Sequence, residues 1–79
     1  MNIYTYSFIS QCPNDNDYIY YTAQIKTKKM IMIEDIKSHC EKYKKDYHES
    51  IADDLFSKFK GKQAITATHK SVKIKTIRK

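Results

Sequence analysis

The sequence contains one glycine, Gly61, and one proline, Pro13, and it has no tryptophan. A glycine-rich loop that wraps the phosphates of a nucleotide is therefore excluded, because such a loop needs several glycines close together. The aromatic strands of RNA-recognition domains are excluded for the same reason, since glycines flank their aromatic residues. Nucleotide binding through either of these motifs is not expected.

Cysteine is also scarce, because Cys12 and Cys40 are the only two. Two cysteines do not make a disulfide framework. The longest purely apolar run, from Met30 to Ile33, is far too short to cross a membrane. No basic region precedes an apolar stretch at the N-terminus, so we expect no signal peptide. We predict a cytoplasmic protein with no membrane partner.

No spacing typical of a metal site or a catalytic site occurs. The residue types that bind zinc follow no C-x-x-C or H-x-x-x-H pattern; they are Cys12, His39, Cys40, His48 and His69. His39 and Cys40 would diverge by about 100° on a helix, and Cys40 is interpreted as a small buried residue. His48–Glu49 is interpreted as part of a helix cap, and Asp53–Asp54 would point apart. We therefore expect no metal, no cofactor and no enzymatic activity.

Positive charge is plentiful, and it is concentrated near one end of the chain. Fourteen lysines and one arginine outnumber nine acidic residues, and the formal net charge is +6. From Lys58 to Lys79 there are eight basic residues and no acidic one. This balance favours a nucleic acid or an acidic protein as partner. Because lysine lacks the fork with which arginine reads guanine, we expect nucleic-acid contacts without sequence specificity.

Period-two alternation predicts strands at both ends of the chain. Residues 2–10 and 18–27 alternate around the polar turn CPNDND, which indicates a β-hairpin. Residues 64–68 and 72–77 alternate again, and the segment 69–71 between them is either a turn or a bulge. The C-terminal part therefore forms either a second hairpin or one long bent strand.

Between these strands the apolar period becomes helical over residues 33–60. One helix of that length would measure about 40 Å, more than a small domain spans. We therefore predict two helices, 33–43 and 46–60, with Asp46 as a cap residue; one unbroken helix is the alternative. Gly61 occupies the place of a C-terminal helix cap.

Together these patterns predict a single α+β domain over residues 1–79. We expect a small antiparallel sheet of three or four strands, with the order ββ-αα-β or ββ-αα-ββ. One or two helices would pack on one face of this sheet, because each amphipathic element must bury its apolar side.

The predicted binding residues lie on the C-terminal strand and on the second strand. A basic patch is expected from Lys70, Lys73, Lys75, Arg78 and Lys79. The alternative is a solvated sheet edge, since charged residues protect edges from pairing with other chains. Tyr18 and Tyr20 are candidates for base stacking, for a protein interface or for cross-strand packing.

No signature motif names a family. In size, in the ββ-α-β order and in its richness in Lys, Ile, Asn and Tyr, the chain resembles small proteins of phages and mobile elements, among which anti-CRISPR proteins are prominent. This resemblance implies a non-catalytic inhibitor in the host cytoplasm. Such an inhibitor binds stoichiometrically to a host protein or ribonucleoprotein complex that handles nucleic acid in defence.

Two other functions stay open. The first is direct, sequence-tolerant binding of DNA or RNA through the lysine-rich C-terminal strand. The second is a homodimer in which the tyrosine-rich sheet forms the interface.

Overall fold

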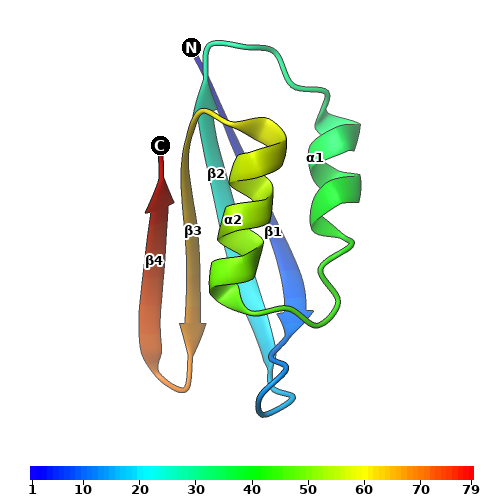
Figure 1. The fold of residues 1–79 in the computed structure, drawn as a ribbon, viewed down its shortest axis with the longest axis vertical. Helices are drawn as coiled ribbons and strands as arrows, with labels where there is room; N and C mark the ends of the chain where they lie inside the picture. The colour runs from blue at the N-terminus through cyan, green and yellow to red at the C-terminus, as the bar shows by residue number, and fades with distance from the viewer.

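Two β-hairpins joined by two helices make up the fold of residues 1–79 in the computed structural model (Figure 1). The elements in chain order are β1 (Asn2–Gln11), β2 (Tyr18–Thr27), α1 (Ile33–Cys40), α2 (His48–Phe59), β3 (Lys62–His69) and β4 (Val72–Arg78). The strands form one antiparallel sheet in the order β1-β2-β3-β4. The α+β prediction is confirmed, in its four-stranded ββ-αα-ββ form with two helices.

The second hairpin turns at Lys70 and Ser71, immediately after the last pair of the ladder, His69 with Val72. Both turn residues have positive φ angles, 50° and 69°. Two consecutive residues of that kind make the tight hairpin turn whose twist matches the flanking strands. The open choice between a hairpin and a bent strand is thereby decided in favour of the hairpin.

Both helices are shorter than their apolar period predicts, because the chain between them contacts β1. The Gln11 N–H donates to the Lys44 carbonyl over 3.0 Å. The Asp46 N–H donates to Ser10 Oγ over 3.3 Å. The predicted cap at Asp46 is wrong, since α2 begins after Tyr47 and has no side-chain cap. Tertiary hydrogen bonds to β1 take the place of local capping here.

The end of α2 matches the prediction at Gly61. This residue has a φ of +73°, and a Cβ atom placed there would lie 2.7 Å from the carbonyl oxygen of Lys26. Glycine is therefore required both by the backbone angle and by the close approach of β2. The tight turn brings β3 alongside β2 directly after the helix.

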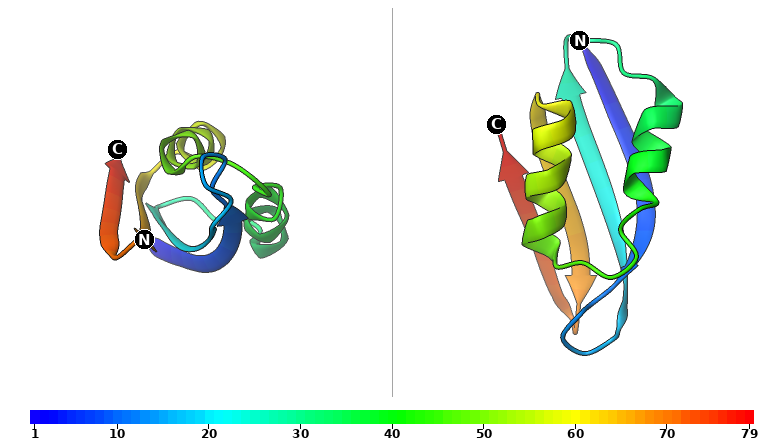
Figure 2. Two further views of the ribbon diagram at one scale, coloured as in Figure 1. Left: turned by 90° about the horizontal axis from the view of Figure 1, so that it is seen from below. Right: turned by 45° about the vertical axis from the view of Figure 1, so that its right-hand side comes forward.

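The core lies between the helices and one face of the sheet. Both helices cover the same face, as the two views of Figure 2 show. α1 packs over β1, whereas α2 packs over β3 and β4. The most deeply buried large side chains come from α2 and from the two central strands; they are Tyr21, Ile25, Ile51, Leu55 and Ile65. Neither helix is long and apolar enough to cross a membrane.

A hydrogen-bonded cluster joins α2 to α1 and to the segment that follows α1. The Tyr43 hydroxyl donates to Asp54 Oδ2 over 2.5 Å, and His39 Nε2 lies 2.7 Å from the same oxygen. The bond from Tyr43 is the main cause that lowers the pKa of Asp54. This carboxylate therefore stabilises the folded state in its charged form.

The pH dependence of folding should reveal this cluster. Because the pKa of Asp54 is lower in the folded chain, its contribution is complete above about pH 4 and is lost as the pH falls further. We expect Asp54→Asn to lower the free energy of unfolding at pH 7 by about 1 kcal/mol or less, since the side chain is half exposed. Urea unfolding of both proteins at pH 7 and pH 3 measures this, and an equal difference at both pH values would contradict it.

Candidate functional site

Four of the predicted binding residues lie on the open face of the sheet, which the helices leave uncovered. Lys73 and Lys75 of β4 are exposed there. Tyr18 and Tyr20 of β2 share this face because their neighbour Ile19 is buried on the helix side, and their exposed fractions are 69% and 76%. Lys79 follows β4 and is exposed. The structure therefore places two of the predicted lysines and both predicted tyrosines on one surface.

Arg78 lies elsewhere, because strand alternation turns it toward α2. Its Nη2 donates to Glu49 Oε1 over 2.8 Å, and its Nε donates to Asp53 Oδ1 over 2.9 Å. The hydrogen bond to Glu49 is the main cause that raises the pKa of Arg78. Two acids compensate this charge, so Arg78 ties β4 to α2 and does not extend the basic surface of the open face.

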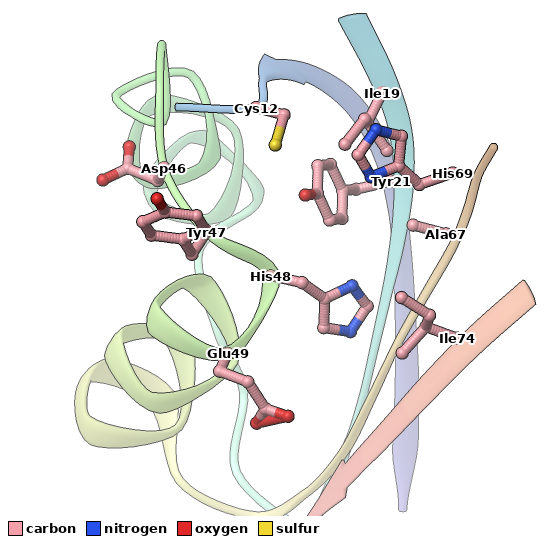
Figure 3. A pocket seen from close by; sticks show the side chains of 10 residues that line it. All are labelled: Cys12, Ile19, Tyr21, Asp46, Tyr47, His48, Glu49, Ala67, His69 and Ile74. Carbon is pink, nitrogen blue, oxygen red and sulfur yellow. The ribbon is translucent and has the colours of Figure 1, made fainter. Parts of the chain in front are cut away.

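A pocket of about 240 Å³ lies on the opposite, helix-covered side of the sheet (Figure 3). The residues that line it come from the first hairpin, from the start of α2 with the segment before it, and from the second hairpin; they are Cys12, Ile19, Tyr21, Asp46, Tyr47, His48, Glu49, Ala67, His69 and Ile74. Several of these side chains are ionisable or reactive, and the sequence pattern did not predict that they lie together.

A thiol, a carboxylate and an imidazole lie together beside this pocket, and two of them, Cys12 and His69, line it. Cys12 Sγ, an Asp15 carboxylate oxygen and a His69 ring nitrogen all lie within 4.8 Å of one another. His69 Nε2 is 3.0 Å from Asp15 Oδ2, which is an ion-pair distance for a protonated ring, although the geometry is not that of a hydrogen bond. The sequence analysis missed this cluster because Cys12 and His69 lie near opposite ends of the chain.

The turn after β1 holds the cluster in place. The Cys12 N–H donates to the Asp17 carbonyl over 2.8 Å, and the Asp17 N–H donates to Asp15 Oδ1 over 3.0 Å. This second bond is the main cause that lowers the pKa of Asp15, and the Cys12 thiol and His69 add to it. Lys70 lies 3.5 Å from Asp15 Oδ2 and 3.2 Å from Asp17 Oδ2. Asp15 is therefore a carboxylate at neutral pH.

His48 offers a second imidazole to the pocket. Figure 3 shows its ring turned into the pocket, and its centroid lies 5.4 Å from that of Tyr21. Neither ring nitrogen is exposed to solvent or has a hydrogen-bond partner. Burial lowers the pKa of His48, so the ring is neutral at pH 7. Both nitrogens lie inside the structure, so a ligand in the pocket does not reach them in this conformation.

The two cysteines differ in what they can do. Cys40 is completely buried in the core, and burial raises its pKa to about 12, so it is an inert thiol. Cys12 is also largely buried, with 8% of its surface exposed, but it lines the pocket and lies beside an imidazole and a carboxylate. The same three groups are zinc ligand types, but the Lys70 ammonium group beside Asp15 would repel a metal cation.

Comparison with known proteins gives one structural likeness. No family model and no curated protein sequence matches the chain. The fold is similar to the crystal structure of the archaeosine synthase QueF-Like in the apo form, with a TM-score of 0.78 and 19% sequence identity. The match covers 98% of this chain and 89% of that chain. At this level of identity, the likeness shows the fold alone.

Proposed function

We propose that this protein is a cysteine-dependent enzyme that modifies a flat nitrogen heterocycle, as an archaeosine synthase does. The observation that carries the proposal is the placement of the Cys12 thiol in a pocket within 4.8 Å of Asp15 and His69. The structural neighbour that matches nearly the whole chain is named a synthase.

In this proposal Cys12 is the nucleophile. Its sulfur forms a bond to an electrophilic carbon of the heterocycle that is doubly bonded to nitrogen or oxygen. The π electron pair of that double bond moves onto the nitrogen or oxygen atom. The thiol proton passes to the His69 imidazole, whose ring nitrogen lies within 4.8 Å of the sulfur. This step is an addition that releases no leaving group, and its product is a covalent adduct between Cys12 and the heterocycle.

The remaining pocket residues suit a planar, hydrogen-bonding substrate. Tyr21 and His48 present rings against which a flat heterocycle can pack. The Glu49 carboxylate also lines the pocket, and although Arg78 donates to its Oε1, its Oε2 can accept a hydrogen bond from an N–H group of a purine-like edge. The pocket volume of about 240 Å³ suits one base-sized ring system.

Selective modification of the two thiols tests the proposal. We expect iodoacetamide to alkylate Cys12 in the folded protein and to leave Cys40 unmodified, because Cys12 borders the pocket and is 8% exposed, whereas Cys40 is completely buried. Purine-like bases should slow the alkylation of Cys12 about tenfold or more at saturation. Intact-mass and peptide mass spectrometry measure both effects, with Cys40→Ala as the matched control. Equal labelling of both thiols, or no protection by any base, would count against the proposal.

The resemblance to anti-CRISPR proteins remains a separate prediction, in which the protein is a non-catalytic inhibitor of a host defence complex. The two functions differ in an observable way. An inhibitor acts at a one-to-one ratio with its target and tolerates Cys12→Ala, whereas an enzyme turns over and does not tolerate this change. A pull-down from bacterial lysate at low salt tests the inhibitor.

A further inference from the structure

The open face of the sheet carries lysines and no acidic residue. Strand alternation places four lysines on it, from three strands: Lys26, Lys62, Lys73 and Lys75. All nine acids lie in the β1–β2 turn, in the helices or in the segment between them: Asp15, Asp17, Glu34, Asp35, Glu41, Asp46, Glu49, Asp53 and Asp54. All four lysines are exposed, and none forms an ion pair. The two sides of the sheet therefore differ sharply in charge.

Two of these lysines repel each other directly. Lys26 of β2 and Lys62 of β3 are paired partners in the antiparallel ladder. Like charges in that position are destabilising, and no acid on this face offsets them. They border a shallow hollow of about 250 Å³ that also includes Lys75, with the small side chain of Ala64 among its lining. An anion that settled in this hollow would relieve the repulsion.

Aromatic rings lie on the same face, at the end of the sheet opposite to this hollow. Tyr18 and Tyr20 alternate with buried Ile19 and are 69% and 76% exposed. Exposed rings on a sheet stack with unpaired bases, and this stacking needs no particular base sequence. Cationic groups beside stacking rings are the combination that single-stranded nucleic acids require, whereas an acidic protein surface needs only the charge.

We propose that single-stranded nucleic acid binds across the open face of the sheet. Its phosphates contact Lys26, Lys62, Lys73 and Lys75, and its bases stack on Tyr18 and Tyr20. The binding tolerates any sequence, because lysine contacts phosphates as a point charge. This surface and the Cys12 pocket lie on opposite sides of the sheet, so the inference does not depend on the proposed enzyme activity.

Fluorescence anisotropy with labelled single-stranded DNA and RNA oligonucleotides tests the proposal. Three or four phosphate contacts predict that log affinity falls with log salt concentration with a slope of about −2 to −3. The double variant Lys73→Glu/Lys75→Glu should weaken binding by about 10-fold to 100-fold. Tyr18→Ala/Tyr20→Ala should weaken it by about tenfold or more.

The matched control is Lys42→Glu/Lys58→Glu, which makes the same charge change at two exposed residues that line a hollow on the helix side with no strand residue in it. Circular dichroism establishes that each variant is folded. An equal loss of affinity in the control, or no binding to the unmodified protein at about 50 mM salt, would overturn the proposal. Tight binding of an acidic peptide without oligonucleotide binding would also overturn it. Cys12→Ala should bind oligonucleotide normally, which separates this outcome from that of the proposed enzyme.

Discussion

Replacement of Cys12 by alanine is expected to lower the rate of product formation by about 10³-fold or more. Removal of a covalent nucleophile leaves only substrate positioning and electrostatic effects, and losses of that size are typical. The rest of the pocket stays in place, since the change removes only one sulfur atom. The measurement is mass spectrometry of the products formed from the purine-like base that best protects Cys12 from alkylation.

Two variants make this result interpretable. Cys40→Ala removes the other thiol, which lies in the core and is fully buried, so it should keep the catalytic rate while losing stability. Cys12→Ser keeps the shape of the side chain but offers a much weaker nucleophile, so it should remain nearly inactive. If Cys12→Ala turned over substrate at the rate of the unmodified protein, Cys12 would not be the nucleophile.

The largest loss of stability is expected from Ile51→Ala. Ile51 is completely buried where α2 meets the sheet. Truncation of a buried Ile costs about 2–5 kcal/mol, through lost hydrophobic transfer and the cavity left behind. That is a large part of the roughly 5–15 kcal/mol that stabilises a small domain. Urea unfolding followed by circular dichroism measures the change.

Ile33→Ala is the matched control for this prediction. It makes the same change on the other helix, at a side chain that is 69% exposed. We expect it to alter the free energy of unfolding by less than about 0.5 kcal/mol. If the two variants were equally stable, α2 would not pack on the sheet as described.

Much of the fold could be predicted because the local pattern and the tertiary structure agree. The period-two runs became strands, and the alternation of VKIKTIR correctly separated Val72 and Ile74 from Lys73 and Lys75. Gly61 marked the end of α2 because only glycine suits its positive φ beside the β2 backbone. Cys40 is buried, as its place on the apolar stripe indicated.

The helix boundaries could not be predicted from the period. The apolar repeat runs through residues 33–60, but the chain leaves the helix after Cys40. The reason is that Lys44 and Asp46 hydrogen-bond to the end of β1, which local sequence does not reveal. The pairing of Arg78 could not be predicted for a similar reason. Its two acidic partners belong to α2 and are distant in sequence.

The sequence by itself determined the strands, the helical segment and the basic character of β4, because each depends on residues close together in the chain. Only the tertiary structure decided which charges remain unpaired and which reactive groups meet. Lys73 and Lys75 are free on the open face, whereas Arg78 is paired on the other. Cys12 and His69 come together because the two hairpins lie side by side in one sheet. The C-terminal ends of β1 and β3 therefore lie at the same end of that sheet.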